Sequence, residues 1–415
     1  MALLDSLTQL FKPREQSVIG IDIGSSAIKV VQLRRKKGRA VLETYGELAI
    51  GPYGGVEIGR VAQLSGEKLI EAFNDLLRES HVTTKSGGLA IPLSSSLITF
   101  ITVPSVNEKQ LAEMITLEAR KYIPVPINEV MLDWSIIPKD ETLPEDTDSV
   151  SVQTQPTPVT VRNAEVQTPH QAPLQTSLQN QGQGQVQTQP QVQAQSQSTG
   201  NTTEVLVVAI HNESLTGYQT LMNRIGVTTS FFEIELFSAV RAVLERGVQP
   251  QMIVDMGAGS TKLYIIERGI LRASHIINRG SQDITLAISK SMGIPVNEAE
   301  NLKRVYGLQG GPEYKELAEV ITLNLDYVFY EANRVLLNFQ RKHNKAISKV
   351  FLTGGGVLMK GFVDLAAQSF QSEVVYANPF SKVETPAFFA DQLKEAGPEF
   401  AIAIGAALRR LSESA

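Results

Sequence analysis

An apolar strand pattern that ends in Asp-x-Gly occurs twice in this chain. The first copy covers residues 18–29 and the second covers residues 251–262. In each copy, small residues follow the Asp-x-Gly, and a second strand pattern of alternating apolar residues comes next. The two aspartates, Asp22 and Asp255, lie a whole domain's length apart. This spacing indicates a duplicated domain rather than a short structural repeat.

Both segments have the residues expected of phosphate-binding turns. Glycine and serine in a hairpin turn let backbone N–H groups approach phosphate oxygens closely and form an anion-binding concavity. An aspartate at the end of the preceding strand can hold a hydrated Mg²⁺ ion, which prefers carboxylate, water and phosphate oxygens as ligands. Two such turns that face each other would hold one triphosphate between two domains.

A third glycine-rich motif follows later in the chain. Residues 350–353 form an apolar strand pattern, and Gly354, Gly355 and Gly356 come directly after it. Three residues without side chains leave room for a flat purine or a ribose. Gly361 completes the glycine spacing of a P-loop, but no Lys-Ser/Thr pair follows it, which excludes a Walker A site.

Other sequence features exclude several classes of function. A Rossmann fingerprint is excluded because Lys262 stands where its third glycine is required after Gly257 and Gly259. The five histidines show no metal-ligand spacing, and no Gly-x-Ser-x-Gly hydrolase motif is present. The absence of cysteine excludes disulfides, thiolate metal sites and a cysteine nucleophile. A net charge of -5 argues against a nucleic acid partner.

The composition is that of a globular protein of two or three domains. Of the 415 residues, 42% are hydrophobic, which can supply sizeable cores. The longest apolar stretches, such as residues 205–210, are far shorter than the roughly 20 residues that a membrane span requires. The first residues lack a basic region ahead of an apolar one, so we expect no secretory signal. These observations predict a cytoplasmic protein.

Two segments have more than one interpretation. Residues 141–203 carry acidic residues, Pro, Thr and then many Gln in place of apolar periodicity, which predicts a disordered linker. The linker is either a tolerated surface loop or a Gln-rich self-association segment. The apolar residues between Leu3 and Phe11 share one helical face and form either a docking helix or a frayed terminus.

Hydrophobic periodicity predicts strands and helices on both sides of the linker. Residues 294–349 show helical periodicity, and a last helix is expected near 398–411. The other expected elements are strands at 18–23, 28–33, 40–45, 88–92, 97–103, 130–137 and 204–210, and helices at 66–80, 107–122, 214–225 and 235–245.

The three glycine-containing motifs, in this order, resemble those of the actin-like ATPase superfamily, which includes actin, FtsA, MreB, DnaK-type chaperones and sugar kinases. The resemblance implies ATP and Mg²⁺ as cofactors. It also implies that Asp22 and Asp255 hold Mg²⁺ through water and that Lys29 reaches phosphate oxygens. The other nucleotide-binding residues that it implies in these motifs are Gly24, Ser25, Ser26, Gly257, Ala258, Gly259, Ser260, Thr261, Gly354, Gly355 and Gly356.

The resemblance implies three further site residues. Glu235 stands where the superfamily offers a polar residue that orients the attacking water, and Glu233 is an alternative. Either glutamate also fits a solvated helix start, where acidic residues are favoured. Residues 297–304 are similar to the segment that brackets the ribose, which implies Glu300 and Lys303. Charge pairs at this spacing are also common on solvated helix faces without a ligand.

Within the superfamily, the chain resembles the PilM family of type IV pilus assembly proteins over nearly its whole length outside the linker. Residues 118–133 match the pattern E-x-x-K-Y-I-P-x-P-x-x-E-V-x-x-D, and residues 377–380 and 397–409 match as well. From the residues alone, Pro124 and Pro126 end a helix and force extended backbone. The linker is a departure, because the family usually passes this point through a much shorter connection.

The resemblance implies an α/β actin-like ATPase fold, with two ribonuclease-H-like lobes around a nucleotide cleft and a small inserted subdomain in the first lobe. The expected ranges are 1–82 for the start of the first lobe, 83–140 for the inserted subdomain, 141–203 for the linker, 204–248 for the rest of the first lobe, 249–293 and 350–397 for the core of the second lobe, 294–349 for its outer helical part, and 398–415 for a helix that returns to the first lobe.

The function implied by the resemblance is that of a nucleotide-gated adaptor. MgATP would close the cleft, and the closed protein would bind the cytoplasmic N-terminal peptide of a PilN-like inner-membrane protein at the inner face of the cytoplasmic membrane. Other pilus platform or motor proteins are further candidate partners, and hydrolysis would be slow or dispensable. An FtsA- or MreB-like membrane-tethered cytoskeletal ATPase is the alternative, and a phosphotransferase is a third hypothesis.

Overall fold

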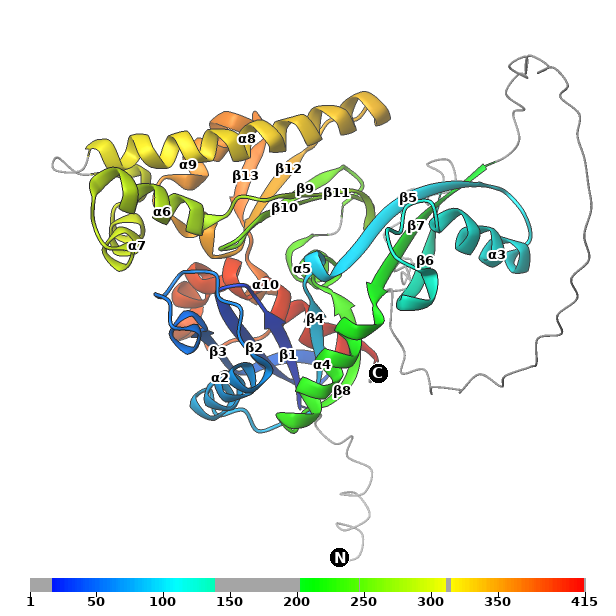
Figure 1. Ribbon diagram of the computed structural model, residues 1–415, viewed down its shortest axis with the longest axis horizontal. Helices are drawn as coiled ribbons and strands as arrows, with labels where there is room; N and C mark the ends of the chain where they lie inside the picture. The colour runs from blue at the N-terminus through cyan, green and yellow to red at the C-terminus, as the bar shows by residue number, and fades with distance from the viewer. Residues whose placement is uncertain (1–16, 139–201, 246, 311–314, 414–415) are drawn as a thin grey trace, which may run out of the picture.

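The computed structural model describes residues 17–138, 202–245, 247–310 and 315–413 (Figure 1). Residues 141–201 of the predicted linker and the apolar stripe at 3–11 lie outside the described residues. The described chain forms two five-stranded sheets and one three-stranded sheet. Helices cover the two larger sheets, so the molecule has the mixed α/β character predicted from the sequence (Figure 1).

The first sheet has the strand order β3-β2-β1-β4-β8. Strands β1, β2 and β3 are antiparallel neighbours, whereas β4 and β8 run parallel to β1. The hairpin of β1 and β2 is the first Asp-x-Gly segment, and its strands are almost entirely buried. The five strands are β1 (Ser17–Ile23), β2 (Ala27–Lys36), β3 (Arg39–Ala49), β4 (Ser86–Ile91) and β8 (Thr228–Ile234).

The second sheet repeats this topology with the strand order β11-β10-β9-β12-β13. Its first three strands are again antiparallel neighbours, and the last two again run parallel to the first. The duplicated motif in the sequence is therefore a duplicated domain in the structure. The strands are β9 (Gln251–Met256), β10 (Thr261–Glu267), β11 (Ile270–Ile277), β12 (Lys349–Thr353) and β13 (Glu373–Tyr376).

Helices close the faces of the first sheet. Helix α2 (Gly66–Glu79) buries Ala72, Phe73 and Leu76 on one face, and its first turn is capped by the Ser65 side chain. Helix α4 (Asn212–Arg224) packs near β7 and β8, and α5 (Glu235–Val243) follows β8 directly.

Four helices cover the second sheet: α6 (Ser281–Met292), α7 (Val296–Val305), α8 (Lys315–His343) and α9 (Phe362–Phe370). Their buried side chains share one core with β9, β10 and β12. Helix α8 runs along the outer edge of this lobe in Figure 1.

A third sheet of order β5-β7-β6 forms a small separate layer with helix α3 (Glu108–Ala119) (Figure 1). Its strands are β5 (Ser96–Pro104), β6 (Val130–Ile137) and β7 (Thr202–His211).

The small sheet and the first sheet correct two of the ranges predicted from the sequence. Strand β4 lies within 83–140 but pairs in the first sheet, and β7 runs into 204–248 but is the central strand of the small sheet. Periodicity locates strands, whereas it does not say which neighbours they pair with.

The last helix, α10 (Ala390–Glu413), connects the two lobes. It contacts β12 in the second sheet and packs against β1, β2 and α5 in the first lobe. A Cβ atom at Gly20 of β1 would lie 2.0 Å from the Ala403 carbonyl oxygen, so only glycine allows this close approach. The helix begins at Ala390, before the predicted start near Pro398, and Pro398 lies inside it.

Candidate nucleotide site

A cavity of about 330 Å³ lies between the Asp-x-Gly turns of the two lobes, which is within the usual range for ligand pockets. Both turns, α7, the loop after β12 and α10 contribute to its wall. Two of the predicted residues, Gly259 and Thr261, are not in this wall. The predicted residues that do line it are Asp22, Gly24, Ser25, Ser26, Lys29, Glu235, Asp255, Gly257, Ala258, Ser260, Glu300, Lys303, Gly354, Gly355 and Gly356.

The two turns are closed by equivalent backbone hydrogen bonds. In the first, the Gly24 N–H donates to the Ala27 carbonyl at 3.0 Å, and in the second the Gly257 N–H donates to the Ser260 carbonyl at 3.0 Å. Each aspartate also sits opposite a lysine on the neighbouring antiparallel strand. Asp22 is paired in register with Lys29, and Asp255 with Lys262. The sequence repeat therefore places two matched pairs of carboxylate and ammonium groups on one cavity.

Burial changes the proton affinity of both aspartates. It raises the pKa of Asp22 to about 7, against the opposing effect of Lys29. It also raises the pKa of Asp255, and there Lys262 is the main opposing charge. Both groups are almost completely buried, and Glu235 adds a third carboxylate nearby. The lysines thus do not fully offset the effect of burial on these carboxylates, so a cation that enters the cavity would be attracted to them.

Glu235 is held by groups from both lobes. Its Oε1 accepts a hydrogen bond from the Leu93 N–H at 2.6 Å, and its Oε2 lies 2.8 Å from Lys262 Nζ. Lys262 Nζ also lies 3.7 Å from Asp255 Oδ2. Although burial disfavours its charge, these carboxylates raise the pKa of Lys262. Lys262 therefore remains an ammonium group that bridges the two lobes.

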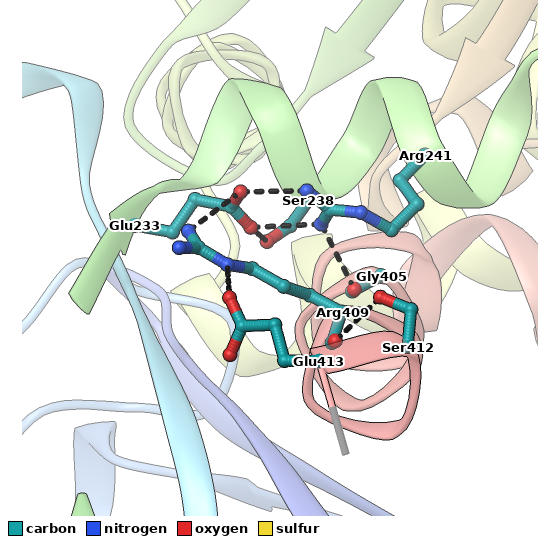
Figure 2. Close-up of polar contacts among 7 residues, drawn as sticks. All are labelled: Glu233, Ser238, Arg241, Gly405, Arg409, Ser412 and Glu413. Carbon is teal, nitrogen blue, oxygen red and sulfur yellow. Dashed lines mark hydrogen bonds and ion pairs between the residues drawn. The ribbon is translucent and has the colours of Figure 1, made fainter. Parts of the chain in front are cut away.

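Glu233, the alternative to Glu235, does not reach the cavity. It is fully buried between α5 and α10, where Arg241 lies 2.7 Å and Arg409 lies 3.0 Å from its Oε1 (Figure 2). Ser238 donates a further hydrogen bond to its Oε2 at 2.7 Å. Burial opposes ionisation, but the two arginines hold the pKa of Glu233 below its usual value. Glu233 is thus part of the contact that fixes α10 to the first lobe.

The predicted pair on α7 lines the cavity from the second lobe. Lys303 Nζ lies 2.6 Å from Glu300 Oε2, and both side chains are buried. Thr285 donates to the same carboxylate oxygen at 2.6 Å, and Arg304 Nε lies 2.7 Å from Glu300 Oε1. The pair is therefore not a solvated surface pair, which was one of its two interpretations.

The glycine run after β12 approaches the second turn very closely. Gly354 has a φ of +85°, and a Cβ atom there would lie 2.6 Å from Asp255 Oδ1 and 2.5 Å from the Met256 carbonyl oxygen. Its N–H donates to the Pro398 carbonyl at 2.8 Å. Positive φ and close contact together require glycine. This loop joins Asp255 to the start of the buried part of α10.

Sequence reasoning missed several residues of the cavity wall. Lys262 was considered only as a breach of a Rossmann pattern, although its position in the second copy matches that of Lys29 in the first. Glu47 Oε1 lies 3.4 Å from Lys29 Nζ. Glu399 of α10 lines the same cavity and interacts with both Glu47 and Lys29. Arg304 completes this group. Arg304 and Glu399 lie in the matched segments 297–304 and 397–409 but were not named as site residues, and Glu47 lies in no motif. The packing of β3, α7 and α10 brings all three to the cavity.

The donor set fits a hydrated divalent ion held together with phosphate. In the described part of the chain, no cluster of three or more His, Cys, Asp or Glu residues could hold a metal ion by itself. Two carboxylates that share a cavity with glycine- and serine-rich turns match the preference of Mg²⁺, which keeps several waters and takes its remaining ligands from carboxylate and phosphate.

None of the helices among the described residues has the length and apolar content needed to cross a bilayer.

Among curated proteins, the chain is 27% identical over 205 residues to the cell division protein FtsA of Streptococcus pneumoniae serotype 2 (strain D39 / NCTC 7466), covering 42% of this chain and 44% of that protein. It is 23% identical over 147 residues to the ethanolamine utilization protein EutJ of Escherichia coli (strain K12), covering 34% and 47%. The chain thus spans about half the length of these relatives.

The similarity to solved structures extends over almost the whole chain. A chain of a PilM-PilN type IV pilus biogenesis complex superposes with a TM-score of 0.70 at 23% identity, covering 96% of this chain and 99% of that one. The ethanolamine utilization protein EutJ from Carboxydothermus hydrogenoformans superposes with a TM-score of 0.50 at 14% identity, covering 96% and 90%. These likenesses confirm the actin-like fold. The family model described as type IV pilus assembly protein PilM matches residues 20–177 and 184–411, so the chain belongs to the PilM family.

Proposed function

We propose that this protein binds MgATP in the cavity between its lobes and acts as a nucleotide-gated adaptor in type IV pilus assembly. The observation that carries the proposal is the pair of matched turns, each with an aspartate and a lysine, on one cavity. Such a site offers backbone N–H groups and ammonium groups to a triphosphate, and carboxylates to its metal ion.

The residues have separate roles in this proposal. Asp22 and Asp255 hold the metal ion through water, while Lys29 and Lys262 balance phosphate charge. Bound Mg²⁺ supplies charge neutralisation of the phosphates. The glycines after β12 leave room for the nucleoside, and the Glu300–Lys303 pair lies at the wall of the same cavity. A ligand that contacts both turns and the loop before α10 would stabilise the closed arrangement of the lobes.

Slow hydrolysis is part of the proposal. Glu235 is the candidate residue for orienting an attacking water, but a backbone N–H and the Lys262 ammonium already contact its two oxygens. Both oxygens are therefore already engaged, so orienting a water for rapid turnover requires Lys262 to move first. Gating by binding alone needs no such movement.

The proposed partner is the cytoplasmic N-terminal peptide of a PilN-like inner-membrane protein. Family membership supports it, as does the likeness to a chain from a PilM-PilN complex. Through this peptide the protein would lie at the inner face of the cytoplasmic membrane. Other pilus platform or motor proteins are further candidate partners.

The test is a calorimetric titration of the full chain with that peptide from the same organism, with and without saturating MgATP. We expect one-to-one binding that is tighter with MgATP, and loss of the nucleotide effect in Asp255→Asn. The matched control is Asp75→Asn, because Asp75 is an aspartate on α2 outside the cavity. Equal binding with and without nucleotide would remove the gating, and no binding by a protein that takes up MgATP would remove the pilus partner.

A second candidate function is a membrane-tethered cytoskeletal ATPase, because the chain shares sequence with FtsA. The two functions predict different behaviour on membranes. MgATP-dependent sedimentation of the protein with liposomes, in the absence of any partner peptide, would favour the cytoskeletal function. A protein that stays in the supernatant under all nucleotide conditions would count against it.

A further inference from the structure

Helix α8 is apolar on two opposite faces, and only one of them is buried. Its 29 residues extend for about 43 Å at the usual helical rise. The inner face packs into the core of the second lobe through Leu317, Ile321, Leu325, Val328, Phe329, Ala332, Leu336 and Phe339. An amphipathic helix at the edge of a domain normally has a polar outer face.

The outer face of α8 instead carries four large apolar or aromatic side chains. Leu323 is 73% exposed, Tyr327 is 50%, Tyr330 is 67% and Leu337 is 46%. Their spacing of four, three and seven residues places them on one stripe along the helix. Tyrosine and leucine in a contiguous exposed row are typical of a surface that is covered in an assembly.

The charged residues beside this stripe are separated along the helix. The exposed acids Glu316, Glu319 and Asp326 lie in its N-terminal half. The exposed bases Arg334, Arg341 and Lys342 lie in its C-terminal half. A helix with this charge distribution is complementary to a copy of itself that runs in the opposite direction, and it would be repelled by a parallel copy.

We infer that the outer face of α8 binds the same face of a second copy of this chain in an antiparallel, two-fold symmetric dimer. With Tyr330 at the two-fold axis, residues at equal distances from it along the helix face each other. Leu323 then meets Leu337, Asp326 meets Arg334, and Glu319 meets Arg341 of the second copy. The apolar pairs and the charge pairs agree on one register.

Two local features are compatible with this register. Glu319, Leu323 and Asp326 adjoin one another with Ala318 and Thr322 on the N-terminal half of the helix, where the basic half of the second copy would lie. Arg334 has an ion pair with Glu331 on its own helix, but it remains 55% exposed and can accept a second carboxylate.

Charge exchange tests the inference on the full chain by analytical ultracentrifugation over a range of concentrations. The wild type should be in a monomer–dimer equilibrium. Asp326→Arg or Arg334→Asp alone should weaken the dimer by at least about tenfold, because each puts like charges opposite each other. The double variant should restore the dimer, and so should an equimolar mixture of the two single variants. A wild type that stays monomeric throughout would overturn the inference, as would a double variant no better than the single ones.

Cysteine crosslinking tests the axis independently, because the chain has no cysteine of its own. Tyr330→Cys should form a disulfide-linked dimer under mild oxidation. Leu323→Cys alone should not, but mixed with Leu337→Cys it should. Leu117→Cys is the control, because Leu117 is 65% exposed on α3, and α3 lies away from α8 (Figure 1). Equal crosslinking of the control and Tyr330→Cys would show random collision and would overturn the register.

Discussion

Lys262 Nζ lies 2.8 Å from Glu235 Oε2, so strand β10 of the second lobe and helix α5 of the first are joined by an ion pair at the cavity. Both side chains are largely buried, and Lys262 also faces Asp255. This ammonium group lies 3.7 Å from Asp255 Oδ2 and is the main charge that opposes the effect of burial on Asp255. The contact thus combines two roles: it holds the lobes together and it compensates buried acid.

Lys262→Met should destabilise the protein strongly. The substitution leaves buried carboxylates without their cation, which we expect to cost about 3–5 kcal/mol of unfolding free energy. Urea denaturation measures this loss. Lys68→Met is the control, because its ion pair with Glu71 is half exposed on both sides and should contribute less than about 1 kcal/mol.

Millimolar Mg²⁺ should restore more stability to Lys262→Met than it adds to the wild type, because the ion replaces the lost positive charge beside the aspartates. The measurement is the urea midpoint of both proteins with Mg²⁺ and with EDTA. An equal response of the two proteins would show that the aspartates do not attract the ion.

Arg409→Leu should separate α10 from the first lobe. Arg409 is 1% exposed and contacts Glu233 (Figure 2). It also stacks over Phe231, with its guanidinium carbon 4.1 Å from the ring centroid. Removing it leaves Glu233 with Arg241 as its remaining arginine partner, and we expect a loss of about 3 kcal/mol. Limited proteolysis within α10 and urea denaturation would both report the change.

Glu413→Gln is the matched control for Arg409→Leu. Glu413 accepts a hydrogen bond from Arg409 Nε at 2.8 Å, but its side chain is 37% exposed. A partly hydrated partner contributes less, so the variant should stay within about 1 kcal/mol of the wild type. If Glu413→Gln and Arg409→Leu were equally destabilised, the buried contact with Glu233 would not be the important one.

Glu399→Gln should change how stability depends on pH. Burial, together with the neighbouring Glu47, raises the pKa of Glu399 from 4.5 to about 7. Between these two values the unfolded chain releases a proton that the folded chain keeps, so the native state loses stability as pH rises through this window. The penalty is complete above about pH 7. The variant lacks this titration and should gain stability relative to the wild type between pH 5 and pH 8.

Urea midpoints of the wild type and Glu399→Gln at the two pH values measure the effect. Any hydrogen bond that the substitution removes acts at both values, so only the change in the difference counts. Glu395→Gln, at an exposed position on the same helix, should show no such change. A constant difference for Glu399→Gln would contradict the raised pKa.

The repeated motif was enough to predict the duplicated domain because it is local, and the resemblance of all three glycine-containing motifs to the actin-like superfamily implied the fold. Each Asp-x-Gly hairpin is one continuous segment, and its alternating residues report which strand face is buried. The predicted ranges placed β4 with the inserted subdomain and β7 with the first lobe, whereas β4 pairs in the first sheet and β7 in the small one. The sequence could not show this because strand neighbours are set by long-range packing. Strand β8 was missed for a related reason: Thr228, Thr229 and Ser230 lead it, so its apolar pattern is short.

The residues of the candidate site that belong to local motifs were also predicted from the sequence, and those that depend on long-range packing were not. Asp22, Asp255 and the turn glycines belong to motifs, whereas Glu47 and Glu399 reach the cavity only when β3 and α10 are in place. The two glutamates near residue 235 could not be separated by sequence. Strand alternation at the end of β8 sends Glu233 toward the arginines of α5 and α10, while Glu235 begins the next helix and faces Lys262.

Gly354→Ala should damage both stability and nucleotide binding. The φ of +85° is unfavourable for alanine, and the added Cβ would meet the Met256 carbonyl and the Asp255 carboxylate at 2.5 and 2.6 Å. Since both are held by the sheet, the loop itself must move, at an expected cost of about 2–3 kcal/mol. Because Gly354, Gly355 and Gly356 line the cavity, the displaced loop should also weaken binding of a fluorescent ATP analogue by about tenfold or more.

Gly217→Ala is the control for this effect of glycine. Gly217 lies inside helix α4, and a Cβ atom there would have nothing within 4 Å. Alanine is the better helix former by about 1 kcal/mol, so this variant should be slightly more stable and should bind the analogue as the wild type does. If the Gly354→Ala variant were less stable but bound the analogue normally, Gly354 would be needed for the contact with α10 and not for the site beside Asp255.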